Sequence, residues 1–117
     1  MSPQLALRAL LEVNRMFMAE QREINAAIIS SYLGIAMSSS DGCTSEAVPV
    51  AEMAERIGLP PSTLYRHIAY LGSGPRAEVP GLGLVETLPD PDDGRSKLVR
   101  LTLKGEAFMG RLLRAIG

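Results

Sequence analysis

The sequence contains a single cysteine, Cys43, and a single histidine, His67, among its 117 residues. One cysteine cannot form an internal disulfide and provides no Cys-x-x-Cys spacing for zinc, so we expect neither a metal nor another cofactor. Cys43 lies in the small, polar stretch from Met37 to Ala47, whose composition predicts a loop. No adjacent basic residue favours its thiolate, so we interpret Cys43 as inert and keep an oxidation sensor as the alternative.

Long apolar runs are absent as well. No run of about 18 or more apolar residues occurs, and the N-terminus lacks the basic segment and apolar stretch of a secretory signal. We therefore expect a cytoplasmic protein without a membrane partner. The chain also lacks a Gly-rich phosphate loop, a His-Glu-x-x-His ligand set and a nucleophile with an adjacent base, so an enzyme is not expected.

The charge is small overall and unevenly distributed. With 46% apolar residues and a formal net charge of −1, the chain has the composition of one domain, residues 1–117, with its own core. Residues 1–60 hold four arginines against seven acidic residues, a balance of −3. Residues 61–117 hold eight lysines and arginines against six acidic residues, a balance of +2. Because DNA binding depends on local positive charge, the C-terminal half is the expected DNA-facing half.

The N-terminal part, residues 1–36, is predicted to be helical. Ser2-Pro3 indicates an N-cap followed by proline at the first helical position, with a helix running to about Gln21. A second helix is predicted from Glu23 to Ala36. The first helix carries apolar residues on more than one side: Leu5, Leu7, Leu10, Leu11, Val13, Met16, Phe17 and Met18. Such a helix is buried on several sides, by a partner subunit or, alternatively, by its own chain.

Residues 48–103 contain a helix-turn-helix pattern. A helix with an apolar face follows Val50, Gly58 stops it, and Leu59-Pro60-Pro61 forms the turn, with Pro61 opening the next helix. His67 follows the core side of that second helix and is predicted to be packed. The residues predicted to point outward are Ser62, Thr63, Tyr65, Arg66, Ala69 and Tyr70. Their hydroxyls, arginine and tyrosines suit a DNA major groove, although a merely solvated helix face has a similar composition.

Downstream of this pattern, two strand-like runs flank an acidic loop. Leu84 to Leu88 and Lys97 to Thr102 are the runs, and Arg95 lies near the tip of the loop. A helix-turn-helix followed by a hairpin is typical of a winged helix-turn-helix, so the predicted fold is mainly α with a small β-hairpin, or α+β. The alternative for the loop is that its aspartates only form the turn and that Arg95 makes a surface ion pair.

The segments VAEMAERIGLPPSTLYRHIAYL and DPDDGRSKLVRLTLKG together resemble the multiple antibiotic resistance regulator (MarR) family of winged-helix transcription factors. The resemblance covers Val50 to Gly105. It implies that Arg95 lies at the wing tip and enters or borders the minor groove, with Asp93 fixing its guanidinium. An arginine held in this way suits the negative potential of a narrow minor groove. Ser96 and Lys97 are expected to add phosphate contacts.

The chain departs from the family pattern at three places, and the first is the loop from Met37 to Ala47, which is longer than usual. Ten residues from Gly72 to Gly81 are inserted before the wing, so the second helix of the pattern is predicted to end near Leu71. After Thr102, a predicted N-cap, only residues 104–117 remain for a short C-terminal helix. The apolar side of that helix is predicted to consist of Phe108, Leu112, Leu113 and Ile116. The helical extensions at both ends are expected to form the dimer contact.

The helix-turn-helix and the hairpin point to DNA, and the resemblance implies a transcriptional regulator that binds double-stranded DNA as a homodimer. Two recognition helices about one DNA turn apart would read a pseudo-palindromic site. The resemblance implies repression by blocking promoter access, relieved by an unidentified small-molecule effector at the dimer junction. The alternative is a winged-helix protein–protein interaction module that does not bind DNA, which the net negative charge favours.

Overall fold

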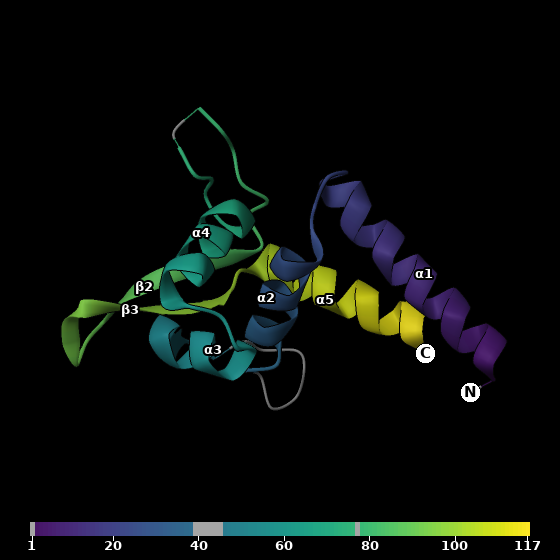
Figure 1. Cartoon of the computed structure of the whole chain (residues 1–117), viewed down its shortest axis with the longest axis horizontal. Helices are drawn as coiled ribbons and strands as arrows, with labels where there is room; N and C mark the ends of the chain where they lie inside the picture. Colours follow the sequence, from purple (N-terminus) through teal and green to yellow (C-terminus); the bar gives the residue numbers. More distant parts are fainter. Residues whose placement is uncertain (1, 39–45, 77) are drawn as a thin grey trace.

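The computed structural model describes residues 2–38, 46–76 and 78–117, and it contains five helices and a small sheet within these ranges (Figure 1). The elements are α1 (Pro3–Glu20), α2 (Ala26–Ala36), β1 (Val48–Pro49), α3 (Val50–Ile57), α4 (Pro61–Leu71), β2 (Val85–Asp90), β3 (Asp93–Leu101) and α5 (Leu103–Ile116). The predicted fold class, mainly α with a hairpin that follows a helix-turn-helix, is confirmed. Cys43 lies outside the described residues, so neither interpretation of it is addressed.

Side-chain caps decide where the first two helices begin. The Ser2 hydroxyl accepts a hydrogen bond from the Leu5 N–H at 3.2 Å, as the Ser-Pro signal predicts. The helix α2 begins at Ala26 rather than at Glu23. Asn25 is the reason, because its Oδ1 accepts from the Ile28 N–H at 2.9 Å and satisfies an otherwise unpaired donor of the first turn.

The helix-turn-helix forms as its local signals predict. Gly58 ends α3 with a φ of +88°, a left-handed conformation that strongly favours glycine. The N–H groups of Gly58 and Leu59 both donate to the Ala54 carbonyl, at 2.8 and 2.9 Å. Pro61 then opens α4, where its missing N–H leaves no donor unpaired. Main-chain hydrogen bonds, a left-handed glycine and a proline therefore form the turn between the two helices.

The sheet has the strand order β1-β3-β2, and all its pairs are antiparallel. The β2–β3 hairpin, called the wing below, is paired regularly from Val85 opposite Leu101 to Pro89 opposite Lys97, and the register shifts at its tip. β1 is missing from the sequence prediction because two residues show no alternation. β3 begins at Asp93 rather than at Lys97, so part of the predicted acidic loop is strand.

Three aromatic rings join the terminal helices to the winged helix. Phe17 of α1, Tyr32 of α2 and Phe108 of α5 pack edge to face with centroid distances of 5.2 to 5.7 Å, and each ring is at most 1% exposed. The Tyr32 hydroxyl donates to the Gly105 carbonyl at 2.7 Å. Burial strongly raises the pKa of Tyr32, so its hydroxyl remains a neutral donor.

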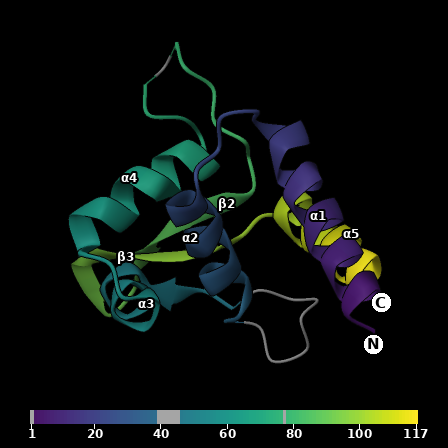
Figure 2. The ribbon, with the colours of Figure 1, turned by 45° about the vertical axis from the view of Figure 1, so that its right-hand side comes forward.

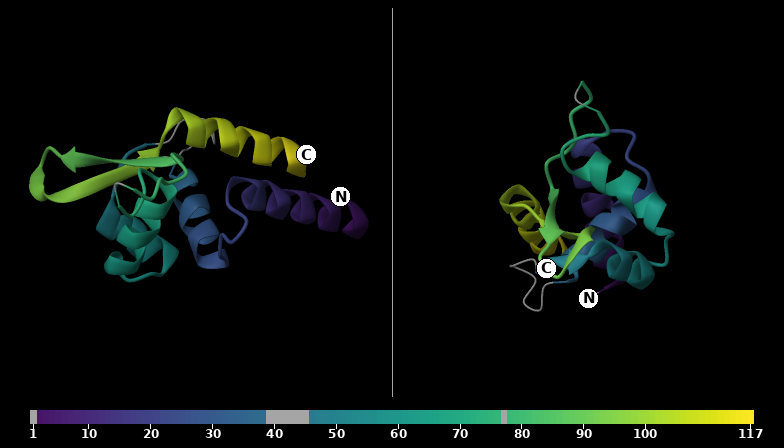
Figure 3. Two further views of the ribbon diagram at one scale, coloured as in Figure 1. Left: turned by 90° about the horizontal axis from the view of Figure 1, so that it is seen from above. Right: turned by 90° about the vertical axis from the view of Figure 1, so that its left-hand side faces the viewer.

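The terminal helices lie antiparallel, with both chain ends together at the end of the molecule opposite the wing (Figure 3). One side of α1 is buried through Ala9 and Phe17. The opposite side carries a second apolar stripe that remains exposed. Together with the exposed end of the α5 stripe, it forms what we call the terminal-helix surface: Leu7, Leu11, Met18, Leu113 and Ile116. The prediction that α1 is apolar on several sides is therefore right, and within the described chain only one side is covered.

Residues 72–76 and 78–83 project beyond α4 as parts of a long loop (Figures 1 and 2). α4 ends at Leu71, as predicted from the inserted residues. Main-chain hydrogen bonds close the base of the loop: Gly83 N–H donates to the Gly72 carbonyl at 2.9 Å, and Leu84 N–H donates to the Leu71 carbonyl at 2.8 Å. No described helix is both long and apolar enough to cross a bilayer. The described residues also contain no cluster of side chains suited to a metal.

Candidate nucleic-acid interface

The N-terminal half of α4 presents polar side chains to solvent. Ser62 and Arg66 are exposed, Tyr65 is 42% exposed, and Thr63 is half-buried. Arg66 donates from Nη2 to the Thr63 hydroxyl at 3.4 Å, and within the described parts of the chain it forms no ion pair. The other N–H donors of this exposed guanidinium can therefore bind a group outside the chain, such as the edge of a guanine or a phosphate.

The C-terminal half of α4 differs from the prediction at Tyr70. Tyr70 does not point outward but lies half-buried against the core, because the loop that follows α4 returns over this turn. The Leu82 N–H donates to the Tyr70 carbonyl at 3.1 Å and marks this return. His67 is half-buried, with Nδ1 2.7 Å from the buried Ser31 hydroxyl. Burial and the nearby Arg66 lower the pKa of His67, so its imidazole is neutral at pH 7 and links α4 to α2.

The wing tip is shaped by Asp93 in a way that differs from the resemblance. Its carboxylate accepts from the Arg95 main-chain N–H at 3.0 Å and from the Ser96 hydroxyl at 2.9 Å, and these bonds lower the pKa of Asp93. Asp93 was expected to contact the guanidinium of Arg95, but it contacts the main-chain N–H of Arg95 instead. An aspartate side chain is short and readily bonds the main-chain N–H two residues further along the chain. Arg95 and Lys97 are exposed, and neither forms an ion pair within the described residues.

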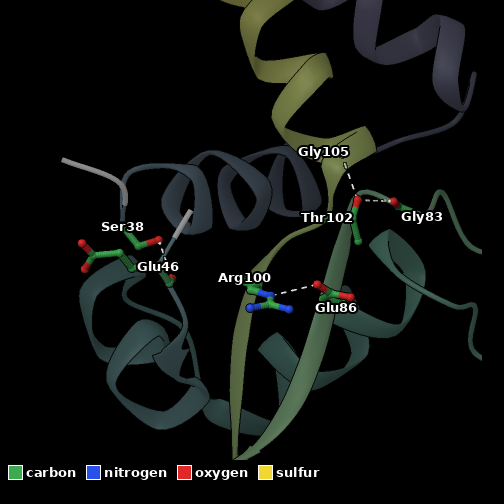
Figure 4. A network of polar contacts seen from close by, with 7 residues as sticks. All are labelled: Ser38, Glu46, Gly83, Glu86, Arg100, Thr102 and Gly105. Atoms are coloured by element: carbon green, nitrogen blue, oxygen red, sulfur yellow. Dashed lines mark hydrogen bonds and ion pairs between the residues drawn. The ribbon is translucent and has the colours of Figure 1, made fainter. Parts of the chain in front are cut away.

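The two faces of the wing have different roles. Directly paired residues share a face, so Thr87 and Lys97 lie on the face that also carries the buried Val85, Val99 and Leu101. The opposite face carries Glu86 and Arg100, which form an ion pair at 2.8 Å (Figure 4). The charge of Arg100 is thus balanced within the wing, whereas that of Lys97 is not. Sequence reasoning missed Thr87, although strand alternation, which places it on the same face as its diagonal neighbour Lys97, could have found it.

A surface hollow of about 470 Å³ separates α4 from the wing. Its lining residues come from both elements and the start of the loop: Tyr65, Ile68, Ala69, Gly72, Ser73, Val85, Glu86, Thr87 and Lys97. Gly72 allows the end of α4 to approach β2 closely, because a Cβ there would lie 2.9 Å from the Ile68 carbonyl oxygen and 3.0 Å from that of Val85. Thus the hollow joins the predicted residues Tyr65 and Lys97, which are 32 positions apart in sequence.

No protein-family model matches the chain, and no curated protein matches it significantly. Solved structures do resemble it. The PcaV transcriptional regulator from Streptomyces coelicolor superposes with a TM-score of 0.61 and 24% identity, over 99% of this chain and 76% of that one. A mutant MarR from E. coli complexed with operator DNA gives 0.62 and 22%, over 97% and 72%. The S. aureus MepR–DNA complex gives 0.61 and 14%, over 96% and 73%.

These similarities extend over nearly the whole chain rather than only over the helix-turn-helix and wing. They therefore include the terminal helices, which the sequence resemblance did not cover. At 14 to 24% identity, the similarity establishes the fold. The chain has the winged-helix fold of MarR-type transcriptional regulators.

Proposed function

We propose that this chain is a cytoplasmic, DNA-binding transcriptional regulator, and a repressor, that reads a pseudo-palindromic site as a homodimer. In this proposal α4 lies in the major groove and the wing lies at the minor groove. One observation carries it: Arg66 on α4 and Arg95 and Lys97 on the wing are exposed cations without ion-pair partners among the described residues, in a fold shared with proteins solved on DNA.

The chemistry of α4 supports contact with bases and phosphates. Arg66 has the fork of donors that binds guanine O6 and N7, and Ser62 and Thr63 lie one turn earlier, at the helix N-terminus. Tyr65 adds an exposed ring and hydroxyl beside them. Because α4 begins with proline and has no acidic residue in its first turn, its N-terminal dipole attracts phosphate without a competing carboxylate.

The terminal-helix surface supports the homodimer. Leu7 is 64% exposed and Leu11 is 49% exposed, although both lie on a regular, well-capped helix. Exposed leucines on a regular helix of a small domain indicate a protein partner, and a second copy supplies the same residues by symmetry. In such a dimer the two α4 helices would lie about 34–36 Å apart and select two half-sites.

A small-molecule effector is part of the proposal in general terms. PcaV has been solved in complex with its natural ligand, which shows that this fold accommodates a ligand in that protein. No described side chain of the present chain defines which compound would bind. The effector is therefore proposed as a class, and the DNA-binding surface is the part that can be tested residue by residue.

The direct test of DNA binding is a titration of mixed-sequence duplex DNA at several salt concentrations. Binding through lysine and arginine releases counterions, so the logarithm of the association constant should fall linearly with the logarithm of the salt concentration. A protein-interaction module with net charge −1 would show no such dependence. Absence of salt-dependent binding to any duplex would overturn the proposed function in favour of that module.

Arg95→Ala should weaken binding to duplex DNA by about tenfold, because it removes the cation that the wing tip offers to the minor groove. Fluorescence anisotropy with a labelled duplex at moderate salt measures the change. Arg114→Ala is the matched control, since Arg114 is an exposed arginine near the C-terminus of α5, far from the wing (Figure 3). Equal affinities of the Arg95 variant and the unmodified protein would remove the wing tip from the binding mechanism.

A further inference from the structure

The hollow between α4 and the wing lies where two DNA grooves would meet. Tyr65 and Ala69 form its α4 side, and Thr87 and Lys97 form its wing side. If α4 occupies a major groove and the wing borders the neighbouring minor groove, the sugar–phosphate strand that separates the two grooves must pass between these elements. The hollow is the space that the fold leaves there.

The lining of the hollow suits a sugar–phosphate strand better than it suits a base or an apolar ligand. Its floor is apolar, formed by Ile68 and Val85, which are 5% and 2% exposed. Its rim is polar, with the hydroxyl of Thr87 on β2 and the ammonium group of Lys97 on β3. The apolar CH groups of a deoxyribose can pack on this floor. The adjoining phosphate can accept hydrogen bonds from the hydroxyl and ammonium groups of the rim.

One acidic residue borders the hollow, and its charge is balanced. Glu86 accepts from Arg100 Nε at 2.8 Å (Figure 4). The strand register places this pair on the face of the wing opposite Thr87 and Lys97. The negative charge next to the hollow is therefore neutralised without using Lys97. Lys97 therefore carries a positive charge at the rim that no carboxylate of the hollow neutralises. Such a charge can bind an anion.

We propose that this hollow binds the sugar–phosphate strand between the major and minor grooves, with Lys97 and Thr87 holding one phosphate and Tyr65 packing on the adjoining sugar. The proposal rests on the proposed function and adds to it a defined phosphate position. It also assigns a role to Thr87, which sequence reasoning did not identify, and to the pairing of Glu86 with Arg100. The hollow then fixes how far α4 and the wing reach into their grooves.

The test uses the full chain and a duplex that the unmodified protein selects from a random pool. Lys97→Gln should weaken binding roughly five- to tenfold and reduce the slope against salt by about one. Thr87→Val, which keeps the shape of the side chain, should weaken binding roughly two- to tenfold and leave that slope unchanged. The control, Arg114→Gln, removes an exposed cation of α5 that does not line the hollow and should bind within about twofold of the unmodified protein.

A scan with single methylphosphonates, which neutralise one phosphate at a time, locates the contact. The unmodified protein should lose affinity at one phosphate per half-site that lies between the grooves, and Lys97→Gln should be insensitive at that position only. If the two proteins gave identical scans, the proposed phosphate contact of Lys97 would be wrong, although the proposal that the chain binds DNA would stand. Failure of the unmodified protein to bind any duplex would instead overturn the proposed function.

Discussion

Phe108→Ala is expected to lower the free energy of unfolding by about 3–5 kcal/mol, the usual cost of removing a fully buried phenylalanine ring. Phe108 is 1% exposed and contacts the rings of Phe17 and Tyr32, with centroid distances of 5.2 and 5.6 Å. The guanidinium of Arg111 also lies 5.2 Å from its ring centroid. For a domain of this length the change corresponds to a decrease in Tm of roughly 12–20 °C, measurable by calorimetry or circular dichroism.

A matched control separates the ring packing from the polar contact beside it. Tyr32→Phe keeps all three rings and removes only the hydroxyl that donates to the Gly105 carbonyl at 2.7 Å, so it should cost about 1 kcal/mol. If the alanine variant at position 108 were no less stable than this control, the aromatic cluster would not be what joins the terminal helices to the winged helix. The account of the core would then be wrong.

The double substitution of Leu7→Lys and Leu11→Lys should convert the proposed dimer to a monomer. Both side chains lie on the terminal-helix surface, and burying an unpaired ammonium group there costs several kcal/mol, which weakens the dimer by roughly 100-fold or more. Sedimentation equilibrium measures the mass, and affinity for the selected duplex should fall together with the loss of dimer. The fold itself should persist, because the opposite side of α1 makes the contacts with the core.

Ala19→Lys is the control for that experiment. Ala19 is exposed on the same helix but lies away from the stripe of Leu7 and Leu11, so it adds the same charge without entering the expected interface. This variant should sediment like the unmodified protein. A dimer that survives the double substitution would show that the two copies meet through another surface, whereas a monomeric unmodified protein would remove the second half-site from the proposed function.

The features predicted correctly from the sequence are those set by local chemistry. Gly58 ends α3 and Pro61 begins α4, and Ser2 and Thr102 cap the N-termini of α1 and α5. Each of these effects extends over only three or four residues. The end of α4 at Leu71 was predicted from Gly72 to Gly81, which are inserted relative to the family pattern. Such signals do not depend on distant parts of the chain, so a single sequence is enough to identify them.

The features that were missed or misplaced depend on contacts between distant residues. Tyr70 was expected to point outward, but the returning loop buries part of it. β1 exists only because Val48 pairs with Val99. The hollow between α4 and the wing requires the register of β2 against β3, which places Thr87 and Lys97 on one face. The sequence proposes the candidate interface residues one by one, and their three-dimensional grouping needed the structure.

The most direct test of the central claim, that two copies of this chain read duplex DNA with α4 and the wing, is selection from a pool of random duplexes followed by sequencing. We expect enrichment of an inverted repeat whose half-site centres lie about one helical turn, roughly 10 base pairs, apart. Recovery of no enriched sequence, or of a single half-site without its inverted copy, would contradict it.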